Sequence, residues 1–227
     1  TQFAQMVPST QVPDAYESYL RQSTSLEGAE HERYQDAKRA LRARLSGRRR
    51  QIQLEMRQSE QRIGAAMARD PDDSLRFLRQ VEARFRKMVR AVGADDLAEK
   101  RQLDDVHQHR IQTRLDRHKQ RARTAAQTAL AQTPPRPHAV YSALEQLLRL
   151  EMKDKVHTLN HLEHLQLADP ARAAQIVEQV RAHLAAVDAQ KDAALRLLDG
   201  ASTAQFGNVR HRLARFLATY ADVERSQ

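Results

Sequence analysis

The sequence predicts an all-α protein, an elongated rod of about six helices that form two antiparallel coiled-coil halves sharing one long helix. Only 4% of the 227 residues are aromatic and only 6 are glycine. Ala, Leu, Arg, Gln and Glu dominate instead, and these residues favour helix over strand. The 7 prolines all lie outside the long stretches of helical periodicity. Those stretches can therefore form continuous helices.

The N-terminal part is expected to contain an irregular lead over residues 1–12 and a short helix over 14–20. One long helix is predicted from about residue 28 to 69, because apolar residues recur there at alternating spacings of seven and four, on one side of a helix. Gly47 is its weakest point. The apolar stripe consists of Tyr34, Leu41, Leu45, Ile52, Met56, Ile63 and Met67.

The next helix is predicted over about 72–132, and Asp70-Pro71 is a typical start signal for it. Its first part has the heptad spacing of a coiled coil, at Leu78, Val81, Phe85, Met88 and Val92. Gly93 and Asp95-Asp96 interrupt this pattern, which resumes at Leu103. We therefore expect the helix to change its partner near residue 93, with a first half over about 13–93 and a second over about 94–225.

Three more helices are predicted over about 138–167, 170–200 and 203–223. Pro134-Pro-Arg-Pro137 ends the preceding helix, Asp169-Pro170 repeats the start signal, and Gly200 is a typical end. Together, residues 13–227 are expected to form a single elongated helical domain.

Several functions are excluded by what the chain lacks. Cysteine is absent, which removes disulfides, thiolate metal sites and cysteine nucleophiles. The glycines are isolated, so there is no phosphate-binding loop. His31-Glu-Arg-Tyr-Gln35 lacks the second histidine of the zinc-protease helix motif. No apolar run reaches the roughly 20 residues of a membrane helix. We expect no enzyme and no direct membrane insertion by this segment.

The charge points to an acidic partner, because 38 Lys and Arg against 29 Asp and Glu give a net charge of +9. Residues 38–50 hold seven cations and no acid, and residues 110–123 hold six cations with Asp116 alone opposing them. Such runs attract polyanions. The alternative is that these charges only keep the helix surface solvated and bind no partner. Proteins that bind single-stranded nucleic acids usually supply aromatic stacking platforms, which are scarce here, and no groove-reading motif is present, so we expect no nucleic acid. A sulfated glycan or an anionic membrane remains.

Histidines provide another candidate site. Of the 10 histidines, His157 and His161 stand four apart and therefore share one helix face, where they can chelate a metal ion. The alternative is an ordinary polar surface. Lys153 and Lys155 lie beside them, so protonated imidazoles could also bind sulfate.

Three motifs resemble the amyloid precursor protein family, in its central helical extracellular domain. They are Pro134-Pro-Arg-Pro-His138, Lys153-Asp-Lys-Val-His-Thr-Leu-Asn-His-Leu-Glu-His164 and Asp169-Pro-Ala-Arg-Ala-Ala-Gln-Ile176. Weaker similarity covers almost the whole chain. The resemblance implies the same rod of two coiled-coil halves that the periodicity predicts. It further implies an antiparallel homodimer, binding of heparin or heparan sulfate proteoglycans, and roles in cell adhesion and neuronal development.

The resemblance also implies site residues and a location. It implies a copper or zinc site formed by four histidines: His31, His107, His157 and His161. A heparin site is implied beside them, for which we nominate Lys38, Arg42, Arg110, Lys153, His157, His161 and His164. The chain would be the extracellular part of a single-pass cell-surface membrane protein, with the membrane helix outside this segment.

One segment departs from the family pattern. Vertebrate members carry Arg-Glu-Arg-Met-Ser where this chain has Ser46-Gly-Arg-Arg-Arg50. Growth-promoting activity linked with that stretch is therefore not expected, and the difference indicates an invertebrate relative.

The leading hypothesis is a non-catalytic extracellular module that binds heparin or heparan sulfate, dimerises and coordinates copper or zinc. One alternative is a BAR-type helical dimer that binds anionic membranes. A metalloenzyme is a third, although no carboxylate is placed as its general base.

Overall fold

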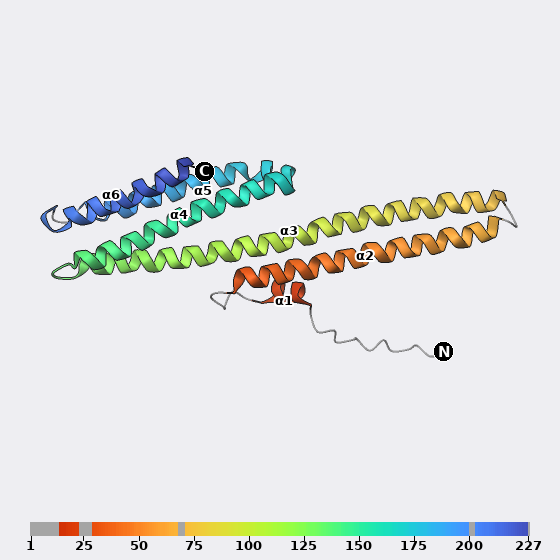
Figure 1. Cartoon of the computed structure of the whole chain (residues 1–227), viewed down its shortest axis with the longest axis horizontal. Coiled ribbons are helices and arrows are strands. Elements are labelled where there is room, and N and C mark those ends of the chain that lie inside the picture. Colours follow the sequence, from red (N-terminus) through yellow and green to blue (C-terminus); the bar gives the residue numbers. More distant parts are fainter. Residues whose placement is uncertain (1–13, 23–28, 68–70, 200–202, 227) are drawn as a thin grey trace. The chain divides into compact units, whose positions relative to one another are not determined.

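The computed structural model describes residues 14–22, 29–67, 71–199 and 203–226. These residues form six helices and no strand (Figure 1), which confirms the predicted all-α fold. The expected lead over 1–12, Asp70 and Gly200 lie outside the described residues. The helices are α1 (Ala15–Arg21), α2 (Glu30–Met67), α3 (Pro71–Ala131), α4 (Pro137–Ala168), α5 (Pro170–Arg196) and α6 (Thr203–Ser226).

Two helix starts have an aspartate cap, and the sequence predicts the one at Asp169. Asp14 caps α1, where its side chain accepts a hydrogen bond from the Glu17 amide at 2.9 Å. Asp169 caps α5 by accepting from the Arg172 amide at 3.4 Å, and Pro170 occupies the first turn. Both arrangements satisfy amide groups that a helix start otherwise leaves without partners. Helix α2 continues through Gly47 without a break, so the helical neighbours on either side outweigh the low propensity of glycine.

The chain divides into two compact units, residues 1–110 and 111–227, and α3 contributes to both. The first unit contains α1, α2 and the N-terminal part of α3. Its apolar core consists of Tyr16, Tyr19, Tyr34, Ala37, Leu41, Leu45 and Leu103. The change of partner expected near residue 93 therefore lies later in the structure, after Arg110, because Leu103 still packs against α1 and α2.

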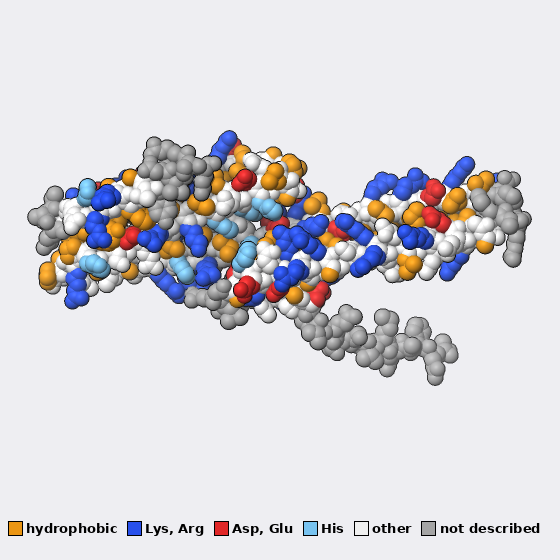
Figure 2. Space-filling view, in the orientation of Figure 1, with side chains coloured by type: hydrophobic (Ala, Val, Ile, Leu, Met, Phe, Trp, Pro, Cys, Tyr) orange, Lys and Arg blue, Asp and Glu red, His pale blue; other side chains and the backbone are white. Residues whose placement is uncertain are grey.

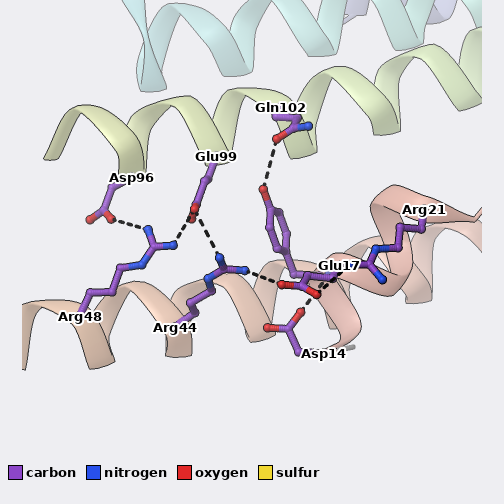
Figure 3. A network of polar contacts seen from close by, with 9 residues as sticks. Asp14, Glu17, Arg21, Arg44, Arg48, Asp96, Glu99 and Gln102 are labelled. Carbon is purple, nitrogen blue, oxygen red and sulfur yellow. Dashed lines mark hydrogen bonds and ion pairs between the residues drawn. The ribbon is translucent and has the colours of Figure 1, made fainter. Parts of the chain in front are cut away.

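Ion pairs connect the three helices of the first unit. Arg44 of α2 lies 3.3 Å from Glu17 of α1 and 3.8 Å from Glu99 of α3 (Figure 3). Arg48 lies 2.7 Å from Glu99, and Arg49 lies 2.9 Å from Asp96, a carboxylate that is only 2% exposed. A carboxylate buried this deeply needs a cation beside it. Part of the acid-poor run in α2 therefore serves the fold.

Arg110 of α3 connects this helix to α1 by hydrogen bonds. Its guanidinium donates hydrogen bonds to the backbone carbonyl of Tyr19 at 2.6 Å and to that of Gln22. It also lies over the Tyr19 ring, 4.2 Å from the centroid, and 3.9 Å from Glu30 Oε2. The Arg110 side chain is only 6% exposed. It satisfies carbonyls at the end of α1 that have no partner within that helix.

The second unit contains the C-terminal part of α3 together with α4, α5 and α6. Small residues of α3 and α5, larger residues of α4 and α6, and Leu198 after α5 form its core. The core holds Ala122, Ala126, Ala129, Val140, Ala143, Leu144, Leu147, Leu148, Ala194, Leu198, Phe206, Val209 and Leu213. In α4, Val140, Leu144, Leu147 and Leu148 are at most 1% exposed, and in α6 the same is true of Phe206 and Leu213.

A buried polar network crosses this core. Lys119 of α3 lies 2.5 Å from Asp154 and 2.6 Å from Glu151, both of α4. His183 of α5 lies 3.0 Å from Asp154, and Thr158 donates to the same carboxylate at 3.3 Å. Burial by itself would raise the pKa of Asp154, but hydrogen bonds from Lys119 and His183 outweigh it and lower that pKa. The network fixes the rotation of α4.

Replacing Arg110 with alanine is expected to destabilise the first unit. The substitution leaves two carbonyls and Glu30 without the cation that satisfies them, so the free energy of unfolding should fall by about 3 kcal/mol. Arg42→Ala removes the same charge from an exposed position and should change the free energy by less than about 0.5 kcal/mol. Urea unfolding followed by circular dichroism measures both. Equal effects of the two substitutions would contradict a structural role for Arg110.

Candidate functional site

A cluster of tyrosine, histidine and carboxylate side chains joins the three helices of the first unit. We call Tyr19, Glu30, Tyr34, Asp104 and His107 the His107 cluster. His107 Nδ1 of α3 lies 3.3 Å from Glu30 Oε1 of α2 and 3.2 Å from the Tyr19 hydroxyl of α1. The Tyr34 ring stacks on the imidazole, with 3.9 Å between centroids and 10° between planes. The Tyr34 hydroxyl donates to Asp104 at 2.6 Å.

The electrostatics of this cluster favour neutral rings. Burial lowers the pKa of His107, with the hydrogen bond and charge of Glu30 opposing this effect. Burial also raises the pKa of Tyr19 and Tyr34, and their hydrogen bonds to Glu30 and Asp104 add to it. His107 is therefore expected to be a neutral imidazole at pH 7, the form in which histidine binds metals.

His31 lies next to this cluster but differs from His107 in its surroundings. The two rings are 6.5 Å apart at their centroids and inclined by 54°. His31 is exposed, and its Nε2 lies 3.4 Å from Gln35 Nε2. Two imidazoles from α2 and α3 thus approach each other at the surface of the first unit. Sequence reasoning found both of them, but only through the family resemblance.

The other two predicted metal ligands lie on α4 in the second unit. His157 and His161 are half-buried on successive turns, as their four-residue spacing predicts. Asp154 and Thr158, which belong to the buried network, occupy the inner face of the same turns. This network keeps α4 from rotating and fixes the face that carries the histidines.

Copper and zinc coordination stays a prediction. Across the described residues, no group of three or more His, Cys, Asp or Glu side chains is placed to hold a metal ion. The four predicted ligands fall two in each unit, with His31 and His107 in residues 1–110 and His157 and His161 in residues 111–227. Their imidazole donors do suit both metals chemically.

The nominated heparin residues differ in their exposure. Arg42 and Lys153 are exposed, and Lys38 is half-buried with its Nζ 5.4 Å from the centroid of the Tyr34 ring. On α4, His164 is exposed. Arg110 is the exception, because its guanidinium is buried and already bonded to backbone carbonyls. Its nomination therefore needs correction, since a buried side chain with these partners is not available to a glycan.

Other cations of the two basic runs also have partners inside the protein. Arg44, Arg48 and Arg49 pair with acids of α1 and α3, and Lys119 pairs with Glu151 and Asp154. The acids lie far from these cations in sequence, so charge runs alone could not reveal the pairing. Even so, lysine and arginine are more numerous than acids on the face of the first unit seen in Figure 2.

Sequence reasoning missed the partners of His107. Glu30 and Tyr19 carry no motif that links them to a histidine far along the chain. Their only signal is that both are placed where α1 and α2 begin or end, close to the start of the apolar stripe at Tyr34.

None of the helices in the described ranges has the length and apolar character required of a membrane span.

Comparison with known proteins adds the family. A model of the E2 domain of amyloid precursor protein matches residues 7–198. An amyloid-beta precursor-like protein of Doryteuthis pealeii is 29% identical over 215 residues, which cover 92% of this chain and 35% of the relative. The chain thus spans about a third of that relative's length.

Solved structures show the same fold. The E2 domain of APL-1 from C. elegans, in complex with sucrose octasulfate, is 26% identical with a TM-score of 0.77, covering 94% of this chain and 95% of that one. The apo E2 domain of amyloid precursor protein-like protein 1 is 24% identical with a TM-score of 0.72, covering 84% of this chain and 97% of that one. The family model covers most of the chain and the fold agrees, so the chain belongs to the amyloid precursor protein E2 domain family.

Proposed function

We propose that the chain is a non-catalytic extracellular module that binds heparin or heparan sulfate. The observation that carries this proposal is the sucrose octasulfate bound to the E2 domain of C. elegans APL-1, because that ligand is a densely sulfated sugar. The net charge of +9 supports it. Membership of a family of cell-surface precursor-like proteins supports the extracellular location.

The contact residues we propose are the outward cations of each unit. On α2 these are Lys38 and Arg42, and on α4 they are Lys153 with His157, His161 and His164. Lysine and arginine bind sulfate as charge-assisted hydrogen-bond donors. Imidazoles become donors of this kind only when protonated. Glycan affinity should therefore rise as the pH falls.

Heparin-affinity chromatography tests this site. Arg42→Ala or Lys153→Ala should weaken binding about two- to five-fold and lower the salt concentration of elution. Arg39→Ala is the matched control on α2, because Arg39 already pairs with Asp36, and it should have a smaller effect. Lowering the pH from 7.5 to 5.5 should raise the elution salt, and this rise should disappear when His157, His161 and His164 are replaced by asparagine.

Two results would count against the proposal. One is an elution salt that does not change with pH. The other is binding to anionic vesicles in a co-sedimentation assay without competition by heparin, which would favour a membrane-binding helical dimer instead.

We further propose that the chain forms an antiparallel homodimer. Apolar side chains remain exposed on the first unit, where Leu54 is 51%, Phe77 55% and Val89 55% exposed. Phe77 also lines a cavity of about 260 Å³ between α2 and α3. A second copy of the chain is the partner that the family resemblance implies, and these side chains are the apolar groups of the first unit that it could cover.

Analytical ultracentrifugation tests the dimer with and without a defined heparin oligosaccharide. The wild type should sediment as a dimer at least with the oligosaccharide, and Phe77→Asp should weaken association about tenfold or more by placing a charge in an apolar contact. Ala83→Asp adds the same charge to an exposed position of α3 and serves as the control. A wild-type monomer under both conditions would refute the dimer.

Finally, we propose that His31, His107, His157 and His161 coordinate copper or zinc. Support comes from the neutral, stacked imidazole of His107, the neighbouring ring of His31 and the shared face of His157 and His161. A bound ion would stabilise one arrangement of the helices, since binding energy at such a site becomes folding energy.

Metal binding is tested by titrating zinc chloride into the chain in a calorimeter. His107→Ala and His161→Ala should each reduce the affinity at least tenfold, because each removes a ligand. His211→Ala, an exposed histidine of α6, should leave it unchanged. Equal affinities of all three variants would exclude the predicted ligand set.

A further inference from the structure

The surroundings of His107 Nδ1 differ from those of any ordinary surface histidine. Two oxygen atoms lie close to it, Glu30 Oε1 at 3.3 Å and the Tyr19 hydroxyl at 3.2 Å. They come from α2 and α1, whereas His107 belongs to α3. The Glu30 side chain is 11% exposed and that of His107 is 16% exposed, so little water reaches this contact.

Counting protons decides which nitrogen of His107 carries the hydrogen. Tyr19 has one hydroxyl proton, and it donates that proton to Glu30 Oε1. The phenol oxygen can then only accept, and an ionised carboxylate also only accepts. Both neighbours of Nδ1 are therefore acceptors, so Nδ1 must be the donor. In a neutral imidazole, the lone pair is then on Nε2.

The plane of the imidazole is fixed separately. The Tyr34 ring stacks on it at 3.9 Å and 10°. Tyr34 is held in turn by the hydrogen bond from its hydroxyl to Asp104, one helical turn before His107 on α3. Stacking restricts rotation about the side-chain bonds, while the hydrogen bond to Glu30 selects one of the two ring flips. His31 has neither restraint, since its ring is exposed and its nearest polar neighbour is an amide.

We propose that Glu30 is a positioning residue that holds His107 in the Nδ1–H form and so presents Nε2 as the atom that binds a metal ion. This inference rests on the metal binding proposed above. Histidine ligands of protein metal sites commonly donate their second nitrogen to a carboxylate, which fixes the ring and strengthens the ligand. Glu30 occupies that place without being a ligand itself, and Tyr19 supports it by directing its proton to the carboxylate.

The tautomer is measurable without any metal. Long-range ¹H–¹⁵N NMR spectra of the metal-free chain should show His107 in the Nδ1–H form in the wild type. Glu30→Gln should lose this form, because the amide of glutamine can donate to Nδ1. Glu32→Gln is the matched control, since it removes the same charge from an exposed side chain in the same first turn of α2. The control should keep the wild-type tautomer.

Zinc titration then measures the consequence. Glu30→Gln should weaken zinc binding about 10- to 100-fold, the usual effect of removing such an outer carboxylate, whereas Glu32→Gln should change it less than about threefold. The proposal is overturned if Glu30→Gln keeps the Nδ1–H form, or if both variants lose the same affinity.

A second variant separates Glu30 from its neighbour and covers the case in which Glu30→Gln does not fold. Tyr19→Phe leaves the carboxylate in place, so the Nδ1–H form should persist, and its loss would assign the positioning role to the phenol instead. The two proposals can also fail independently. A wild type that binds no zinc, with a tautomer that still depends on Glu30, refutes the metal function and supports the positioning of His107.

Discussion

Ion pairs between α3 and its neighbours are the interaction on which both units depend. In the first unit, Asp96 and Glu99 of α3 receive the guanidinium groups of Arg44, Arg48 and Arg49. In the second, Lys119 of α3 lies between two buried carboxylates of α4. Helices with narrow apolar stripes bury few large side chains. Their packing therefore leaves charges inside, and each buried charge determines which side chain must face it.

These pairs also change how the net charge should be understood. A run of cations without acids indicates an acidic partner outside the protein. In the structure, however, several of these cations pair with acids of the protein itself. Arg44, Arg48 and Arg49 face acids of other helices, and Arg110 faces backbone carbonyls. The cations that remain on the surface, such as Arg42 and Lys153, are fewer and belong to defined helix faces. A sulfated glycan would therefore meet spaced cations rather than a continuous basic strip.

The His107 cluster combines structural and functional demands at one place. Glu30 accepts a hydrogen bond from Tyr19 and lies near Arg110, the residue that connects α1 to α3. Tyr34 belongs to the apolar core and stacks on His107 at the same time. The His107 ring is held at its face by Tyr34 and at one edge by Glu30, so it has little rotational freedom. The conformational entropy of fixing the ring is therefore lost during folding and not when a ligand binds. Such order is what a ligand-binding histidine requires.

The sequence by itself determined the helices and most of their buried faces. Proline, aspartate caps and apolar periodicity act within a few residues, so their effects can be found locally, as the start at Asp169 shows. It also supplied the family, through motifs that lie within one stretch of chain. Only the tertiary structure decided where the first unit ends, which arginines have partners, and that Arg110 is buried. It alone brought Glu30 and Tyr19 to His107. These outcomes depend on side chains that are distant in sequence and meet only when helices pack, and no local pattern encodes which charge will face which.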